Sequence, residues 1–179
     1  MPRTQEQKLS LTEWLVLCLV SEMPTHGFAV AGLLAQDGSI GQIWRVQKAV
    51  IYRSLQRLEQ LALIATAGEE PTHQGPVRSV VAVTPAGRAA AADWLARPVA
   101  HARDVRSELL VKLALLDRAG QSAAPLLAAQ RQQLVPIAAA LLDRLGEATG
   151  FEHTLALWRY ETVSATLRFL DAAMPATVS

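Results

Sequence analysis

The sequence has one cysteine and no long apolar stretch, and each scarcity excludes a class of protein. A lone Cys18 cannot form an internal disulfide, and it has no partner thiols for a metal site. The densest apolar run, residues 14–20, falls far short of the about 20 residues that a membrane-spanning helix needs. Residues 1–8 are mostly polar and lead into a helix start, unlike a secretory signal. We therefore expect a cytoplasmic protein with no membrane partner.

Uncompensated charge is scarce as well. The 179 residues carry 17 Lys and Arg against 16 Asp and Glu, a net charge of +1, while 51% of the residues are hydrophobic. A disordered chain would be poorer in apolar residues and further from neutrality. The length suits one compact domain or two small ones, with ample apolar material for a buried core.

The sequence motifs of common enzymes are also missing. The histidines are scattered, and none belongs to a His-Glu-x-x-His pair. The sequence has neither a Gly-x-Ser-x-Gly nucleophile turn nor a phosphate-binding Gly-Lys-Ser/Thr loop. We expect no enzymatic activity, and hence no catalytic residue, no metal and no cofactor.

What the sequence does contain is two halves of different character. Up to about residue 98, short helical segments alternate with turns marked by Gly and Pro, and one pair of strands is indicated. Beyond that point Leu and Ala dominate, with long helical periodicity and no strand pattern. The sequence therefore predicts two domains, residues 1–98 and 99–179.

The first half begins with two predicted helices. Ser10 and Glu13 stand three residues apart, as in a capping box that starts a helix. This helix should stop before Pro24, because the proline ring disfavours helix at the preceding residue. A second helix is expected from Thr25 to about Gln36.

A third helix and a pair of strands follow. Residues 47–61 predict the helix, and residues 63–67 and 78–83 are strand-like, with a long polar loop between them. Thr84 and Pro85 are typical of the first positions of a fourth helix. Three helices followed by a hairpin are the layout of a winged helix-turn-helix, in which the third helix can enter the DNA major groove.

The third helix has an apolar face and a basic face. Ile51, Leu55 and Leu58 form a stripe that should be buried, while residues 45–58 contain four Lys or Arg and no acid. Arg and Lys can pair with guanine or phosphate, and Gln can pair with adenine. On the helix and on the wing, the loop between the strands, the candidate DNA-binding residues are Gln47, Lys48, Ala49, Tyr52, Arg53, Gln56, Arg57, His73, Gln74 and Arg78. The other interpretation is a solvated helix face, which the element order and the local lack of acids disfavour.

Several motifs resemble those of the PadR-type bacterial transcriptional regulators. Residues 51–64 are similar to the family pattern Tyr-x-x-Leu-x-x-Leu-Glu followed by Gly-Leu-Ile. Residues 26–28, His-Gly-Phe, resemble the start of the family's second helix, and residues 83–88 resemble the opening of its fourth. The chain departs from the pattern at Ala62, where the family usually has a glycine in a left-handed helix cap, and at Val81, which is commonly Tyr.

This resemblance implies a homodimeric DNA-binding repressor. Its third helix, with Lys48, Tyr52, Arg53 and Arg57, would lie in the major groove, and its wing near Arg78 would meet the backbone. Several family members release DNA when a small aromatic or apolar effector binds between the two domains. An alanine in the cap at position 62 would cost about 1 kcal/mol unless the turn is built differently.

The second half predicts three helices, over residues 104–118, 122–146 and 152–173, with Pro136 expected to kink or split the middle one. Their apolar stripes exceed what three helices can bury among themselves, so we expect a homodimer. Candidate interface residues are Leu109, Leu113, Leu155, Trp158 and Phe169. A two-fold dimer would place two recognition helices roughly 34 Å apart, one turn of DNA. The alternative is a monomeric helical bundle.

The predicted fold is therefore mostly α with a small β-hairpin: an N-terminal winged helix-turn-helix and a C-terminal all-helical dimerisation domain. For Trp94 and Trp158, core packing is the first explanation and an effector pocket the second. The predicted partners are double-stranded DNA, a second copy of the chain and a small-molecule effector. The alternatives are a dimeric interaction module that does not bind DNA, and a small-molecule carrier.

Overall fold

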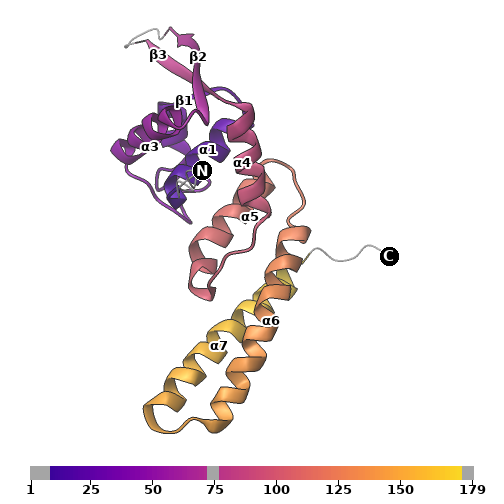
Figure 1. The fold of residues 1–179 in the computed structure, drawn as a ribbon. Helices are drawn as coiled ribbons and strands as arrows, with labels where there is room; N and C mark the ends of the chain where they lie inside the picture. The colour runs from indigo at the N-terminus through magenta and orange to yellow at the C-terminus, as the bar shows by residue number, and fades with distance from the viewer. Residues whose placement is uncertain (1–8, 72–76, 175–179) are drawn as a thin grey trace, which may run out of the picture. The chain divides into compact units, whose positions relative to one another are not determined.

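The computed structural model describes residues 9–71 and 77–174 of the chain (Figure 1). Contacts within the chain divide it into two compact units, one up to Trp94 and one from Leu95 onward. The N-terminal unit consists of helices with a small sheet, and the C-terminal unit is helical. This agrees with the predicted fold class. Among the described residues, no helix combines the length and hydropathy that crossing a membrane requires.

The first helix, α1 (Leu11–Glu22), forms the centre of the N-terminal unit. The predicted capping box is confirmed: the Glu13 carboxylate accepts from the Ser10 amide at 2.7 Å, and the Ser10 hydroxyl accepts from the Glu13 amide at 3.3 Å. All six residues from Leu15 to Val20, including Cys18, are buried. A helix buried on all sides needs apolar residues all round, which explains the dense apolar run in the sequence.

The second helix is shorter than predicted, because α2 spans only Gly27–Leu33. Thr25 and His26 are extended instead and form a short strand, β1, that pairs with Val81 and Val80. His26 then caps α2, since its Nδ1 accepts from the Ala29 amide at 3.0 Å. The sequence prediction was wrong at both ends of this helix, and the sheet has one strand more than the predicted hairpin.

The third helix, α3 (Lys48–Gln60), agrees with the prediction, and Ile51, Leu55 and Leu58 are buried as expected. It ends in the left-handed cap that the sequence left open, because Ala62 has a φ of 54°. The Ala62 amide donates to the Glu59 carbonyl at 2.9 Å and the Leu63 amide to the Leu58 carbonyl at 3.0 Å. These two bonds define a Schellman motif with alanine in the position usually held by glycine.

The sheet contains β2 (Ile64–Glu70) and β3 (Arg78–Val83), and its strand order is β1-β3-β2 with antiparallel pairing throughout. β2 extends three residues beyond the predicted strand end, and the pairing shifts register between Thr66 and Gly68. His73 and Gln74, which were expected in the wing, lie outside the described residues.

The fourth helix, α4 (Pro85–Ala96), begins where Thr84 and Pro85 predicted. The Thr84 hydroxyl accepts from the Gly87 amide at 3.1 Å and lies 2.8 Å and 3.1 Å from the carbonyls of Ala62 and Leu63. A Cβ atom on Gly87 would lie 1.9 Å from the Leu63 carbonyl oxygen. Only glycine therefore allows the first turn of α4 to lie this close to the end of α3.

The C-terminal unit begins with irregular helical turns. A 3₁₀ turn, η1 (Ala102–Asp104), and a π-helical turn, η2 (Val105–Leu109), precede α5 (Leu110–Arg118). The long helices α6 (Ala124–Glu147) and α7 (Gly150–Ala173) then pair with each other (Figure 1). The expected split at Pro136 does not occur, because α6 continues through this residue. A proline removes only one backbone hydrogen bond, and the exposed position leaves space for its ring.

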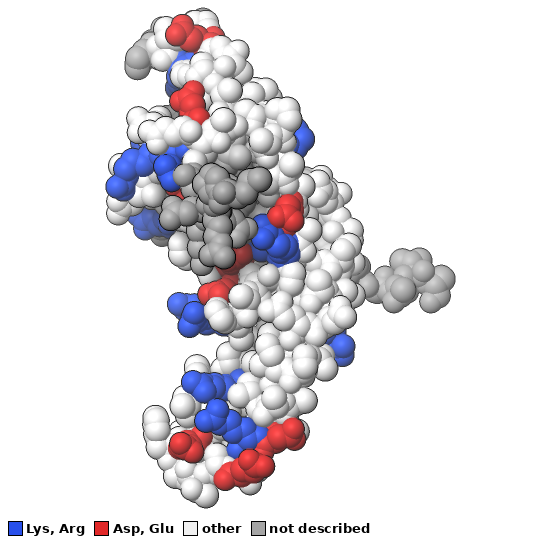
Figure 2. All heavy atoms as spheres, viewed as in Figure 1, with Lys and Arg blue, Asp and Glu red and all other residues white. Residues whose placement is uncertain are grey.

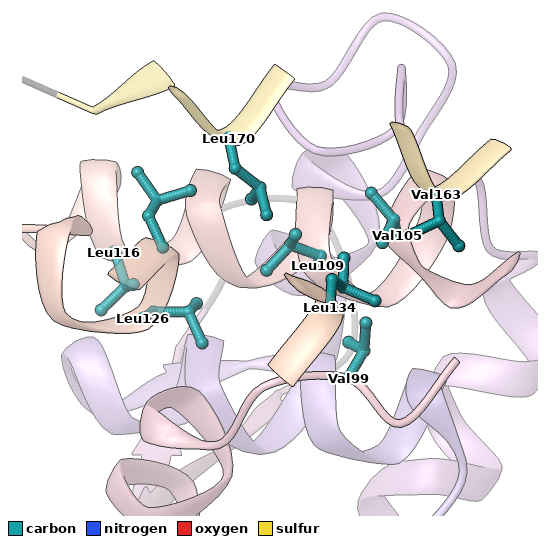
Figure 3. Packing of buried hydrophobic residues seen from close by; sticks show 9 residues of the cluster. Val99, Val105, Leu109, Leu116, Leu126, Leu134, Val163 and Leu170 are labelled. Carbon is teal, nitrogen blue, oxygen red and sulfur yellow. The ribbon is translucent and has the colours of Figure 1, made fainter. Parts of the chain in front are cut away.

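The core of the C-terminal unit joins all of these helices (Figure 3). Its members are Val99, Val105, Leu109, Leu116, Leu126, Leu127, Leu134, Val163 and Leu170. The fully buried Gln130 accepts from the Val99 amide at 2.7 Å and donates to the Val99 carbonyl at 3.1 Å. The buried Lys112 donates to the Arg97 carbonyl at 2.8 Å and pairs with Glu108 at 2.9 Å. Both polar side chains thus hold the segment between α4 and α5 on the helices.

Candidate nucleic-acid interface

The face of α3 opposite its buried stripe is open to solvent. Its exposed side chains are those of Lys48, Ala49, Tyr52, Arg53, Gln56, Arg57, Glu59 and Gln60, and Val50 is half-buried on the flank. Figure 2 shows Lys and Arg side chains gathered over the region of α3. Gln47, the residue before the helix, is exposed and makes no side-chain bond with the first turn.

The basic side chains on this face are not neutralised by their surroundings. Arg53 and Arg57 form no hydrogen bond or ion pair with any residue in the described ranges. The first acid after them in the chain, Glu59, accepts from the Thr66 hydroxyl on β2 at 2.9 Å. The guanidinium donors are therefore available to an external acceptor.

Tyr52 lies at the edge of the same face, and its exposed fraction is 42%. Its ring packs over the first residue of α2, because a Cβ atom on Gly27 would lie 2.8 Å from Tyr52 Cε1 and 3.0 Å from Leu55 Cδ1. Gly27 thus allows α2 and α3 to approach closely while the phenol stays accessible. The glycine of the His-Gly-Phe motif has a packing role that explains its place beside Tyr52.

Next to Tyr52, the aromatic ring of Phe28 lies close to two cations from other elements. The Lys48 Nζ atom is 5.3 Å from the ring centroid, and the Arg78 guanidinium carbon is 4.6 Å from it. Both distances are within the range of cation–π attraction. Phe28 is 54% exposed, so this cluster of α2, α3 and β3 residues lies at the surface.

His26 connects α2 to the wing strands. Its Nδ1 accepts the Ala29 amide, so the proton of the neutral imidazole is assigned to Nε2. Nε2 lies 3.3 Å from a Glu70 carboxylate oxygen and 3.5 Å from an Arg78 guanidinium nitrogen. The Glu70 carboxylate is thereby held against the histidine.

A groove with a volume of about 510 Å³ runs between α3 and the wing strands. Tyr52 and Gln56 line it from α3, Thr66 and Arg78 from the strands, and Phe28 from α2. Hydrogen-bond donors from helix and wing thus converge on one surface. The sequence predicted the contributions of α3 and Arg78, but it missed Phe28 and His26 as members. The only signal for these two was the His-Gly-Phe motif.

The C-terminal unit carries a second candidate site, an open and largely apolar cavity with a volume of about 920 Å³. Trp158 and Phe169 line it from α7, where they are 70% and 37% exposed. Its rim includes Arg103, Arg106 and Arg168, together with Glu161. The combination of apolar walls and cations suits a flat apolar surface or an apolar anion.

The other residues predicted for the dimer interface or an effector pocket are less accessible. Leu109 is fully buried in the core of its own unit, which leaves no surface for a partner, while Leu113 and Leu155 are half-buried. Trp94 is also buried, and its ring stacks on Trp14 with centroids 5.4 Å apart and planes 7° from parallel. This stacking corresponds to core packing, the first of the two explanations considered for Trp94.

Comparisons with known proteins give one family match. No curated protein matches the sequence. Among solved structures, Bacillus subtilis PadR in complex with operator DNA is 18% identical, with 91% of this chain and 96% of that chain covered and a TM-score of 0.48. The complex of the same protein with p-coumaric acid is 16% identical, with coverage of 91% and 96% and a TM-score of 0.43. The Streptococcus mutans protein smu.1604c is 16% identical, with coverage of 89% and 96% and a TM-score of 0.44.

The family match covers the elements that form the candidate interface. Residues 16–93 match the sequence model of the "Transcriptional regulator PadR-like family". This segment runs from the middle of α1 into α4 and includes α2, α3 and the wing strands. It also includes the three motifs on which the resemblance was based. Residues 16–93 of this chain are therefore similar to the PadR-like family of transcriptional regulators.

Proposed function

We propose that the protein is a homodimeric transcriptional repressor that binds a palindromic DNA operator. The observation that carries the proposal is the exposed basic face of α3, where Arg53 and Arg57 have no partner among the described residues and the one acid, Glu59, bonds to Thr66 on β2. Tyr52, Lys48 and Arg78 add donors beside it. The match of residues 16–93 to the PadR-like family supports a regulator rather than an enzyme.

The proposed binding mode places α3 in the major groove and the wing strands against the backbone. Arginine donors suit guanine edges, and Gln56 suits adenine. Lys48 lies at the start of the helix and Arg78 at the start of β3, and both are suited to neighbouring backbone phosphates. Ala49 could contact a thymine methyl group.

The experiment begins with selection of bound fragments from random or genomic DNA by the purified protein. On the selected site, the double variant Arg53→Ala/Arg57→Ala should weaken binding by at least about 30-fold, since each lost base contact costs about 1–3 kcal/mol. The control variant Arg144→Ala/Arg159→Ala removes two exposed arginines of the C-terminal unit and should leave affinity unchanged. Unaltered affinity in the Arg53/Arg57 variant, with the fold intact, would show that α3 does not read the DNA.

The alternative, an interaction module that does not bind DNA, predicts a different response to salt. DNA binding releases counterions, so log affinity should fall linearly with log salt concentration by about 0.9 per neutralised phosphate. A selection that recovers no enriched sequence at low salt would favour the interaction module.

The dimer proposal is supported by the exposed apolar side chains of α6 and α7. Besides Trp158 and Phe169, the exposed large hydrophobic residues here are Val135, Ile137, Leu142, Phe151 and Leu157. Large exposed apolar patches mark interaction sites. Equilibrium sedimentation should give a dimer at micromolar concentration, and Trp158→Glu should shift it toward monomer. A wild-type monomer at that concentration would contradict the proposal.

A small apolar or aromatic effector is proposed for the cavity beside Trp158 in the C-terminal unit. The apolar walls and the arginines at its rim support a ligand with a ring and a negative charge. Aromatic carboxylates should quench Trp158 fluorescence and release DNA, and Trp158→Phe should lose the quenching. Ligand binding that never alters DNA affinity would instead indicate a small-molecule carrier.

A further inference from the structure

The exposed ring of Phe28, on α2, lies close to two positively charged side chains from other elements. Lys48 is the first residue of α3 and Arg78 the first residue of β3, 20 and 50 positions away in the sequence. Both cations lie within 5.3 Å of the ring centroid. The ring is therefore the common contact of three elements that meet at the candidate interface.

Without this ring, little would hold the two cations near each other, since among the described residues only Arg78 has another polar neighbour, His26 Nε2 at 3.5 Å. Both side chains are long and rich in rotamers, and their like charges repel each other. The negative face of an aromatic ring attracts each cation and limits the positions that it samples. Ordering these side chains before binding lowers the entropic cost of immobilising them on a partner.

We propose that Phe28 is a positioning residue for DNA binding, whose ring holds Lys48 and Arg78 ready for two backbone phosphates. This inference rests on the proposed DNA-binding function. Phe28 itself carries no hydrogen-bonding group, so its effect is transmitted through the two cations. Phosphate contacts set the register of a protein on DNA but carry no sequence information.

The test compares Phe28→Leu with Phe28→Tyr in the full-length protein on the selected DNA site. Leucine keeps an apolar side chain but lacks the aromatic face, so affinity should fall by about 5- to 30-fold, the equivalent of two exposed cation–π contacts. The slope of log affinity against log salt should become shallower by about one to two units. Phe28→Tyr keeps the aromatic face, so it should leave both the affinity and the salt slope at their wild-type values. Met23→Ala, at another exposed apolar residue of the same unit, is the matched control and should change neither.

A double-mutant cycle separates positioning from a direct contact. In the background Lys48→Ala/Arg78→Ala, Phe28→Leu should have almost no further effect, because the cations that it positions are absent. The loss should also be equal on the selected site and on unrelated DNA. An unchanged salt slope with additive losses would show that Phe28 contacts DNA directly, and would overturn the inference while leaving the proposed function in place.

One readout requires no DNA. In the free protein, the ring current of Phe28 should shift the side-chain proton resonances of Lys48 and Arg78, and Phe28→Leu should remove the shift. Far-ultraviolet circular dichroism checks that the variant is folded. Absence of the shift in the wild-type protein would overturn the inference, whereas wild-type protein that binds no DNA would overturn the proposed function together with it.

Discussion

Ala62 and Gly120 close two helices with the same pair of hydrogen bonds. At the end of α5, the Gly120 amide donates to Asp117 at 3.0 Å and the Gln121 amide to Leu116 at 2.9 Å, as Ala62 and Leu63 do at the end of α3. The φ angle is 54° at Ala62 and 62° at Gly120, and both values are left-handed. Glycine adopts this conformation freely, whereas the Cβ atom of alanine is strained in it.

This difference predicts opposite effects of two substitutions. Ala62→Gly should raise the free energy of unfolding by about 0.5–1 kcal/mol, the relief of strain less the greater entropy of the unfolded chain. Gly120→Ala should lower it by about 1 kcal/mol, the cost of alanine in the left-handed conformation. The loss should be no larger, because no neighbouring atom lies within 4 Å of the new methyl group. Urea denaturation measures both. A destabilised Ala62→Gly variant would contradict the assigned strain.

Close backbone approach gives a second prediction for single residues. Gly87→Ala should destabilise the N-terminal unit by more than about 3 kcal/mol, because the new methyl group would overlap the Leu63 carbonyl. The control is Gly146→Ala, at a position inside α6 with no atom within 4 Å, which should stabilise by up to about 1 kcal/mol. Thermal unfolding followed by circular dichroism distinguishes the two. Equal stability of the two variants would contradict the steric explanation.

At the scale of elements, two hydrogen bonds join Gln130 on α6 to the backbone of Val99, in the segment before α5. They predict a large local effect on stability. Gln130→Ala removes both bonds to the buried Val99 backbone, leaving its amide unsatisfied, and should cost about 2–4 kcal/mol. Gln133 still donates to the Val99 carbonyl at 3.1 Å, which limits the loss. Gln132→Ala, at an exposed position of the same helix, should change stability by less than about 0.5 kcal/mol. Similar unfolding midpoints for the two variants would contradict the role of these two hydrogen bonds.

Elements with local signals were predictable from the sequence, and those that depend on distant partners were not. The capping box of α1 and the start of α4 are built from residues within three positions of each other. By contrast, β1 exists only because Thr25 and His26 pair with β3, more than 50 residues later. The helix expected there gives way to this pairing. Of the two effects expected of Pro136, a kink or a split, the split does not occur, because the long α6 tolerates the loss of one bond.

The same distinction applies to the candidate interface. The exposed face of α3 follows from helical periodicity, so its residues could be proposed from the sequence. The cluster of Phe28 with Lys48 and Arg78 joins three elements across 50 positions, and no local pattern indicates it. Leu109 shows the converse error, because periodicity identifies an apolar face without saying whether the chain itself or a partner covers it.

At the scale of the whole molecule, the two units have separate interiors. The core around Leu109 and Leu134 contains only residues from position 99 onward, whereas α1 fills the centre of the N-terminal unit. Stability therefore need not be uniform along the chain, since cooperative units can open separately.

This separation predicts where a destabilising substitution acts. Gln130→Ala should accelerate amide hydrogen exchange in α5, α6 and α7, while exchange in α1 and α3 stays at the wild-type rate. Gly87→Ala should show the reverse pattern. Exchange followed by mass spectrometry of peptides resolves the two regions. Uniform acceleration along the chain in either variant would mean that the protein unfolds as one cooperative body.

The contact between Gly87 and the Leu63 carbonyl has a mechanical consequence. The Thr84 hydroxyl bonds to the carbonyls of Ala62 and Leu63, which follow α3. Because Gly87 has no side chain, the backbone of α4 packs directly against the Leu63 carbonyl. These contacts join the end of α3 and the beginning of α4 into one rigid junction. The orientation of the basic face of α3 is therefore coupled to the direction of the first turn of α4.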